Sequence, residues 1–142
     1  MLTGGCLCGG VRYEIAGALG PVILCHCSQC RRASGSAFAA NASVRADAFR
    51  LLVGTELVRE FEATPGKFRA FCGRCGSPVY ARMDAWPGLR RVRLGTLDGD
   101  PGARPQAHLH VASKAPWDAL ADDGLERFDA EGPAALGAPG DR

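Results

Sequence analysis

The 142-residue chain has few of the features that mark membrane, secreted or nucleic-acid-binding proteins. No apolar run approaches the roughly 20 residues that a membrane-spanning helix needs. The first residues lack a basic segment followed by an apolar one, so we expect no signal peptide and a cytoplasmic location. Seventeen basic and 15 acidic residues leave a net charge of only +2, and aromatic residues make up 7%. These values argue against nucleic acid or a membrane surface as the partner.

Signals for long helices are also scarce. The chain contains 19 glycines and 9 prolines, residues that favour turns. Its apolar segments are short, rich in β-branched and aromatic residues, and separated by turn sequences, which is typical of a mainly β domain. Strands are expected near residues 11–15, 22–27, 36–44, 57–61, 67–72, 78–82, 91–94 and 106–111. Turns are expected at residues 64–66, 76–78 and 86–88.

The few short helices that the sequence predicts lie at residues 28–34, 46–49 and 118–123. The last stretch, residues 131–142, is rich in glycine, proline and alanine. We interpret it as a C-terminal tail that follows a single domain of residues 1–130, a normal size for one hydrophobic core.

Seven cysteines are the most informative feature of the chain; they stand at positions 6, 8, 25, 27, 30, 72 and 75. An odd number of cysteines cannot pair completely, and a reducing cytosol disfavours structural disulfides. Close clusters of cysteine in a cytosolic protein more often bind metal. The sequence therefore predicts metal sites.

The spacing of the cysteines indicates how they share the metal. In an extended segment residues i and i+2 face the same side, so Cys6 and Cys8 can bind one ion together. The segment 25–30 repeats this spacing and then adds a third cysteine. The two residues between Cys72 and Cys75 let both sulfurs converge in a tight turn.

The central segment can thus form a three-sulfur site by itself, from Cys25, Cys27 and Cys30. The remaining cysteines form a complete four-sulfur set: Cys6, Cys8, Cys72 and Cys75. A four-thiolate tetrahedron is a closed structural zinc site, whereas three protein ligands leave a position for water or substrate. Zinc suits all-thiolate ligation, and an iron–sulfur centre is the competing interpretation. A rival grouping adds the last two cysteines to the central cluster and leaves half a site near the N-terminus.

Three histidines are further candidates for the central site. His26 would close that site, but strand alternation points it away from the flanking cysteines, so we expect it to pack or hydrogen-bond behind them. His108 and His110 share one face of a predicted strand. They could reach a metal, or they could be solvated or bonded to the backbone.

Basic residues near the central cysteines are candidates for binding a thiol substrate. Arg31 and Arg32 directly follow Cys30 and could balance the thiolate charge or bind a carboxylate of a peptide-like thiol. Lys114 could form part of the same pocket wall. The alternative is that all three are ordinary surface cations.

Taken together, the motifs resemble the glutathione-dependent formaldehyde-activating enzymes and the related centromere protein V domain. The resemblance spans about residues 4–117. Its motifs are Gly5-Cys6-Leu7-Cys8-Gly9, Cys25-His26-Cys27-Ser28-Gln29-Cys30-Arg31, Phe71-Cys72-Gly73-Arg74-Cys75-Gly76-Ser77, and His108-Leu109-His110 followed by Ser113-Lys114-Ala115-Pro116-Trp117.

The resemblance implies a β-tent fold of short antiparallel strands with two zinc ions per chain. It implies a structural zinc at the four-cysteine set, a catalytic zinc at the three-cysteine set, and the addition of glutathione to formaldehyde to give S-hydroxymethylglutathione. The expected function is therefore that of a carbon–sulfur lyase-like enzyme, with a small thiol and a small carbonyl compound as partners. A non-catalytic, zinc-stabilised binding or scaffold protein is the alternative.

Overall fold

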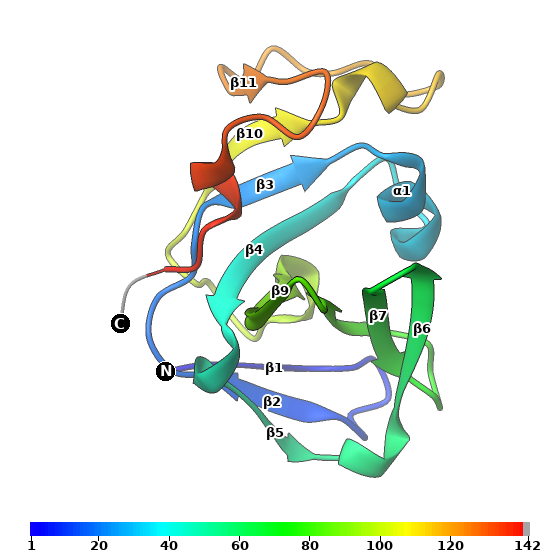
Figure 1. The fold of residues 1–142 in the computed structure, drawn as a ribbon, viewed down its shortest axis with the longest axis vertical. Coiled ribbons are helices and arrows are strands. Elements are labelled where there is room, and N and C mark those ends of the chain that lie inside the picture. Colours follow the sequence, from blue (N-terminus) through cyan, green and yellow to red (C-terminus); the bar gives the residue numbers. More distant parts are fainter. Residues whose placement is uncertain (141–142) are drawn as a thin grey trace.

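The computed structural model describes residues 1–140, which form two β-sheets (Figure 1). The smaller sheet is antiparallel and has the strand order β1 (Leu2–Gly5), β2 (Arg12–Ile15) and β5 (Phe49–Val53). The larger sheet has the order β11 (Glu126–Arg127), β10 (Pro105–Leu109), β3 (Val22–Cys25), β4 (Ala39–Arg45), β9 (Trp86–Arg93), β8 (Pro78–Met83), β7 (Lys67–Cys72) and β6 (Val58–Thr64). The predicted mainly β fold of short strands with few short helices is confirmed.

The larger sheet is mixed rather than wholly antiparallel. Strand β10 runs parallel to both of its neighbours, β3 and β11, whereas the other pairs are antiparallel. A parallel pair needs a long crossover connection, and strands β4 to β9 lie in the chain between β3 and β10. The expectation of antiparallel strands is therefore corrected at this edge.

One α-helix, α1 (Ser28–Ser34), lies directly after β3, as the sequence predicts. The other helical segments are short 3₁₀ turns: η1 (Ala46–Ala48), η2 (Thr55–Leu57), η3 (Leu94–Thr96), η4 (Val111–Ser113) and η5 (Ala134–Gly137). The first of these matches the prediction at 46–49. Within the described residues, none is long and apolar enough to cross a membrane.

Two local predictions are wrong. No helix forms at residues 118–123, where Lys114 Nζ donates to the carbonyl of Asp118 and the Asp123 carboxylate pairs with His108. These contacts with the rest of the protein replace the turns of a local helix. Residues 86–88 are not a turn but the start of β9, because the chain reverses just before, and Met83 pairs with Trp86.

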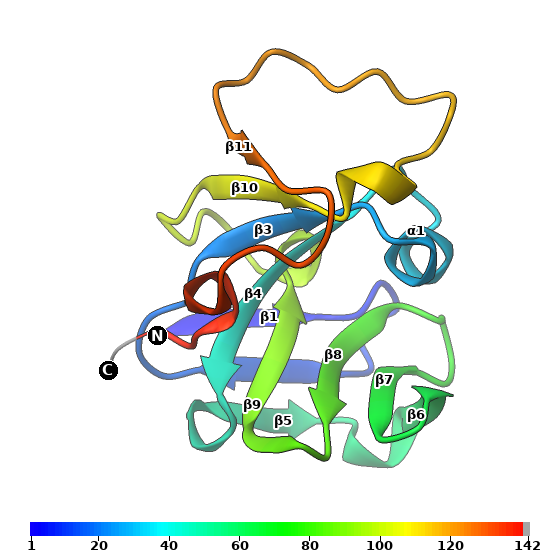
Figure 2. The same ribbon diagram turned by 45° about the horizontal axis from the view of Figure 1, so that its top comes forward.

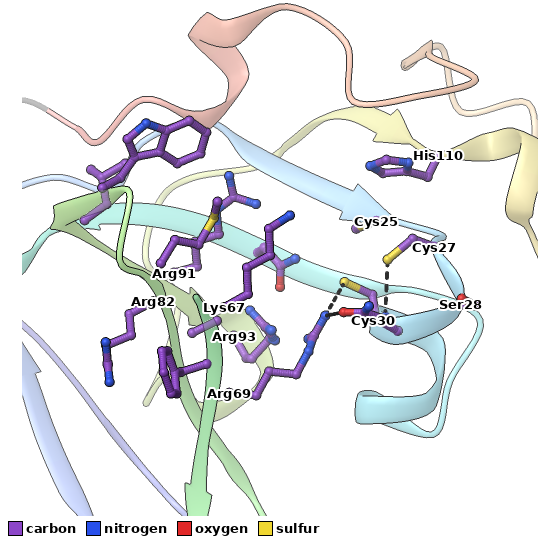
Figure 3. A pocket seen from close by; sticks show the side chains of 17 residues that line it. Cys25, Cys27, Ser28, Cys30, Lys67, Arg69, Arg82, Arg91, Arg93 and His110 are labelled. Carbon is purple, nitrogen blue, oxygen red and sulfur yellow. Dashed lines mark hydrogen bonds between the residues drawn. The ribbon is translucent and has the colours of Figure 1, made fainter. Parts of the chain in front are cut away.

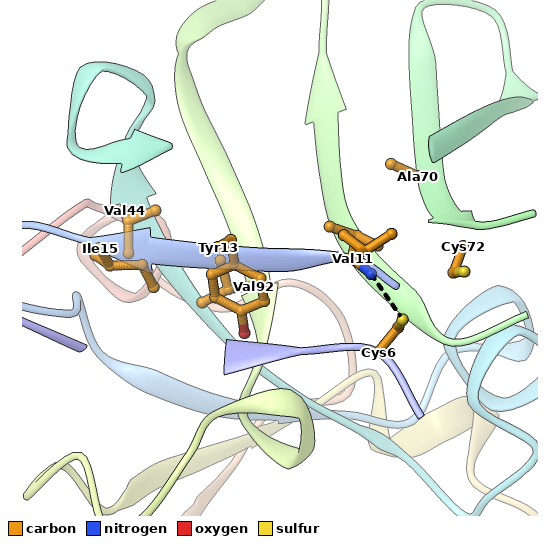
Figure 4. Close-up of a cluster of buried hydrophobic side chains, with 9 residues drawn as sticks. Cys6, Val11, Tyr13, Ile15, Val44, Ala70, Cys72 and Val92 are labelled. Carbon is orange, nitrogen blue, oxygen red and sulfur yellow. Dashed lines mark hydrogen bonds between the residues drawn. The ribbon is translucent and has the colours of Figure 1, made fainter. Parts of the chain in front are cut away.

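The main hydrophobic core lies between the two sheets (Figure 4). It combines alternating residues of β2 with side chains from β4, β7, β8 and β9, and its buried members are Cys6, Val11, Tyr13, Ile15, Val44, Ala70, Cys72, Val79 and Val92. Because side chains alternate along a strand, the neighbouring residues of β7 and β9 point to the opposite face of the large sheet. That opposite face carries the cavity described below.

The C-terminal residues pack against strands β3 and β10 of the large sheet (Figure 2). Leu136 of η5 packs on a second buried cluster formed by Ile23, Ala107 and Leu109. The predicted boundary between a domain and a tail at residue 130 stays a prediction. Part of that tail, residues 141–142, lies outside the described residues.

Candidate metal centres

Four cysteine sulfurs lie together at one end of the main core. Cys6 and Cys8 come from the loop after β1, and Cys72 and Cys75 come from the end of β7 and the turn that follows it. All four Sγ atoms lie within 4.8 Å of one another, with Cys6–Cys8 and Cys8–Cys72 distances of 3.5 and 3.9 Å. The backbone N–H of Val11 donates to Cys6 Sγ at 3.2 Å. The fold thus gathers the predicted four-cysteine set from two distant segments.

Hydrogen bonds hold these two segments in place. Gly76 has a φ of 79°, and its N–H donates to the carbonyl of Cys72 at 2.8 Å, which closes the turn between the last two cysteines. Ser77 Oγ accepts from the N–H of Leu7 at 2.9 Å and lies 3.3 Å from Cys75 Sγ. Hydrogen bonding to Ser77 lowers the pKa of Cys75 to about 5, which favours the thiolate that a metal binds.

The other three cysteines form a second cluster where β3 leads into α1. Cys25 ends β3, Cys27 is the N-cap of α1, and Cys30 lies in its first turn. The three Sγ atoms lie within 4.8 Å of one another, and the N–H of Cys30 donates to Cys27 Sγ at 3.3 Å. Hydrogen bonding among the crowded sulfurs, first from Cys25, lowers the pKa of Cys30, while Cys27 and then Cys30 raise the pKa of Cys25. A bound divalent cation would deprotonate every coordinating thiol.

A cavity of about 330 Å³ opens beside this three-cysteine cluster (Figure 3). Its lining includes the three cysteines of the cluster, His110 and a group of basic side chains: Lys67, Arg69, Arg82, Arg91 and Arg93. None of the described aspartates or glutamates lines it. The cavity is therefore strongly basic at one wall and offers sulfur ligands at the other.

The basic residues of the cavity differ in the groups with which they interact. Arg82 points away from the sulfurs in Figure 3 and pairs with Glu60 and Asp84 at 2.7 and 3.0 Å. Arg69 points toward Cys30, and its Nη2 lies 3.8 Å from Cys30 Sγ. Of these two arginines, Arg69 can therefore offset negative charge on the sulfurs, whereas Arg82 cannot.

The structure does not bring Arg31, Arg32 and Lys114 to this cavity. Arg31 Nε donates to the carbonyl of His26 at 3.3 Å, Arg32 is exposed, and Lys114 Nζ donates to the carbonyl of Asp118 at 2.7 Å. Successive residues are rotated by about 100° around a helix axis. Because α1 buries Cys30, the side chains of Arg31 and Arg32 that follow it point in other directions.

Sequence reasoning missed the basic residues that do line the cavity. Lys67 and Arg69 alternate along β7, and Arg91 and Arg93 alternate along β9, so each pair shares one face of the sheet. The alternation is visible in the sequence. Which face covers the cysteines depends on how distant strands pair, and no local pattern reveals that pairing.

The histidines divide between the interior and the cavity. His26 is fully buried, its Nε2 lies 2.8 Å from His108 Nδ1, and His108 Nε2 lies 2.7 Å from a carboxylate oxygen of Asp123. The expectation that His26 hydrogen-bonds behind the cysteines is confirmed; burial lowers its pKa and favours the neutral ring. Strand β10 ends at Leu109, and His110 takes a φ of 56°, so only His110 of the other two histidines borders the cavity.

The donor atoms of both clusters fit zinc, because thiolates in groups of four or three are typical of it. Among residues 1–140 these two clusters are the groups of three or more close potential ligands. The rival grouping of Cys72 and Cys75 with the central cluster is wrong, since their sulfurs lie with those of Cys6 and Cys8.

Comparison with known proteins gives a consistent result. The model of the family described as "Glutathione-dependent formaldehyde-activating enzyme" matches residues 1–113. A protein of Halomonas elongata, provisionally named as such an enzyme, is 32% identical over 126 residues, covering 82% of this chain and 79% of its own. A crystal structure of a Rhodobacter sphaeroides protein is similar with a TM-score of 0.59 and 25% identity, over 89% of this chain and 98% of that one. The chain belongs to the glutathione-dependent formaldehyde-activating enzyme family.

Proposed function

We propose that the chain is a zinc-dependent enzyme of the carbon–sulfur lyase type, which adds glutathione or a similar thiol to formaldehyde or another small carbonyl compound. The four-cysteine cluster would hold a structural zinc, and Cys25, Cys27 and Cys30 would hold a catalytic one. Membership of the family supports the general activity, glutathione-dependent activation of formaldehyde.

The contrast between the two sulfur clusters carries this proposal. The first cluster has the four ligands that complete a tetrahedron. The second has three, and all three of its cysteines line an open cavity of about 330 Å³. Three protein ligands beside a cavity leave room for a reacting molecule at the metal, as in catalytic zinc sites.

The side chains around the second cluster suit a thiolate reaction. When bound there, zinc would keep an added thiol in its nucleophilic thiolate form. Arg69, 3.8 Å from Cys30 Sγ, stabilises negative charge on the sulfurs in a partly buried place where screening by water is reduced. The cavity walls hold thiol and carbonyl together, and such proximity supplies much of the acceleration of an addition reaction.

Exchange NMR tests this function, because glutathione and formaldehyde combine reversibly in water. The zinc-loaded chain should raise the exchange rate in proportion to its concentration. Cys25→Ser should abolish the increase. Arg104→Gln, which changes an exposed arginine outside the cavity, should retain it.

A different result would favour the scaffold alternative. If the chain carries two zinc ions and still leaves the exchange rate at the uncatalysed value with glutathione and with other small thiols, it is not this enzyme. The zinc ions would then stabilise a binding protein.

A further inference from the structure

The basic wall of the cavity contains buried polar atoms without a partner. Among the described side chains, the buried atoms Arg69 Nη1, Arg93 Nη1 and Asn41 Oδ1 make no hydrogen bond, and all three residues line the cavity. Arg93 is 9% exposed and Asn41 is 3% exposed, so water does not freely satisfy them. Buried donors and acceptors are almost always paired in folded proteins. Two guanidinium donors and one amide acceptor at one place therefore indicate a missing ligand.

Strand pairing brings these groups to one face of the large sheet. Asn41 of β4 is the register partner of Arg93 of β9, and opposite residues in antiparallel strands have neighbouring side chains. Ala81 of β8 is the register partner of both Arg69 and Arg91. The small alanine between two arginines leaves open space, and the sheet holds the donors on rigid strands.

The charge of this wall is not balanced by the protein. Lys67, Arg69, Arg91 and Arg93 make no ion pair with any of residues 1–140. Burial and then the positive charges of Arg69 and Arg91 lower the pKa of Arg93, while Cys30 raises it. Three thiolates with one zinc would contribute a single net negative charge, which is fewer than the four cations present. Lys67 is exposed and Arg69 and Arg91 are half-buried, whereas Arg93 is buried, and a buried unpaired charge is costly unless a ligand neutralises it.

The second cavity beside these arginines does not supply the missing partner. Arg69 and Arg93 also border a space of about 290 Å³, whose other lining residues are mainly apolar and include no carboxylate. The anion that pairs with both guanidiniums must therefore come from outside the described chain.

The position of the arginines limits the kind of anion. Arg69 Nη2 lies 3.8 Å from Cys30 Sγ, so a carboxylate bound to Arg69 lies close to the sulfur cluster itself. In glutathione both carboxylates are several bonds away from the sulfur. In a 2-oxo acid the carboxylate is attached directly to the carbonyl carbon, which is the atom that a thiolate attacks. The short separation thus favours an anionic carbonyl substrate over the carboxylates of the thiol.

We propose that Arg69, Arg93 and Asn41 form a carboxylate subsite, and that the carbonyl substrate of this chain is a small 2-oxo acid of the glyoxylate type. This proposal rests on the proposed function for its chemical step. The thiolate sulfur forms a bond to the aldehyde carbon, the carbonyl π electrons move to oxygen, and the proton released by the thiol returns to that oxygen through water. The product is a hemithioacetal that keeps its carboxylate, and its new hydroxyl donates to Asn41 Oδ1. No oxidant or reductant is needed.

Calorimetric titration of the zinc-loaded protein with oxamate tests the subsite without any reaction. Oxamate carries a carboxylate beside a carbonyl group but does not react with thiols, and ethyl oxamate is its uncharged ester. Oxamate should bind at least about tenfold more tightly than the ester, and Arg69→Gln should weaken it by a similar factor, since each loses a charge-assisted hydrogen bond. Arg104→Gln should bind within about twofold of wild type, because its ion pair is exposed. Arg93→Met is a second variant for the same oxamate titration, provided that its melting curve shows that it folds.

A kinetic comparison separates the two proposals. With glutathione as thiol, wild type should prefer glyoxylate to formaldehyde in kcat/KM, and Arg69→Gln should reduce that preference by at least about tenfold. Equal binding of oxamate and its ester, or equal oxamate binding by wild type and Arg69→Gln, would overturn the subsite even if formaldehyde reacts. Charge-dependent oxamate binding with no thiol addition to either carbonyl would support the subsite and overturn the proposed function.

Discussion

At the scale of single residues, Cys27 shows how one side chain serves both the fold and the site. Its sulfur belongs to the three-cysteine cluster and also accepts the N–H of Cys30 at 3.3 Å, which caps α1. Serine is a good N-cap, so it can keep the cap while giving up a strong metal ligand. The two roles can therefore be separated by the choice of substitution.

Cys27→Ser should abolish the thiol-addition activity and lower the zinc content from two ions to one per chain. Its melting temperature should stay close to that of wild type, because the cap, the core and the four-cysteine cluster persist. Cys27→Ala should lose the same activity and in addition about 1 kcal/mol of folding stability, since alanine cannot cap the helix. Full zinc content in Cys27→Ser would show that Cys27 is not a ligand.

The ion pair between Glu60 and Arg82 predicts a dependence of stability on pH. Two hydrogen bonds from Arg82, at 2.7 and 2.8 Å, lower the pKa of Glu60 from its ordinary 4.5. A carboxylate whose pKa is lowered by folding stabilises the protein above its ordinary pKa, and the contribution disappears as pH falls through the lowered value. Glu60→Gln should thus cost up to about 1 kcal/mol at about pH 7 and less at about pH 4, with the zinc content of both proteins measured at each pH because protonation of the thiols weakens zinc binding.

Urea unfolding at both pH values measures this difference. Glu62→Gln is the matched control, because Glu62 lies on the same strand and makes no ion pair with the described residues. Equal losses for Glu60→Gln at both pH values would contradict a role for the ionised carboxylate.

At the scale of elements, the four-cysteine cluster joins the two sheets. The loop after β1 belongs to the small sheet, and the turn between β7 and β8 belongs to the large one. Cys6 and Cys72 are buried members of the main core, and Cys75 packs against it while only partly buried. A zinc ion there would hold the two sheets together at one end of the main core, where hydrophobic packing is incomplete.

Cys75→Ser should lower the melting temperature by roughly 10 °C or more and reduce the yield of soluble protein. The reason is that a structural zinc contributes folding free energy directly, on the order of 10 kcal/mol in small peptides. Cys27→Ser serves as the control, because it makes the same chemical change in the other cluster. An unchanged melting temperature with two zinc ions still bound would remove Cys75 from the structural site.

At the scale of the whole molecule, the sequence predicted what depends on short-range spacing. The grouping of the cysteines follows from strand alternation and a tight turn, and helix α1 follows from a cap before it and Gly35, with a φ of 64°, after it. Both features are decided within a few residues. The family model matches residues 1–113, the part of the chain that contains all seven cysteines.

What the sequence did not predict depends on contacts between distant segments. The basic wall faces the cysteines because Arg69 and Arg91 pair with the same residue of β8, and Asn41 pairs with Arg93. Arg31 and Arg32 stand closer to the cysteines in sequence, yet the helix carries them out of the cavity. Proximity in sequence was thus a poor guide to which basic side chains line the cavity.

The proposed function requires that the four-cysteine cluster is closed and that the three-cysteine cluster accepts a thiol. Cobalt in place of zinc tests it, because the visible spectrum of cobalt reports the type and number of its ligands. Titration with glutathione should strengthen the sulfur-to-cobalt charge-transfer band of the wild type and leave Cys27→Ser, with metal only at the four-cysteine cluster, unchanged. A wild-type spectrum that stays the same at millimolar glutathione would contradict direct binding of the thiol at the three-cysteine cluster.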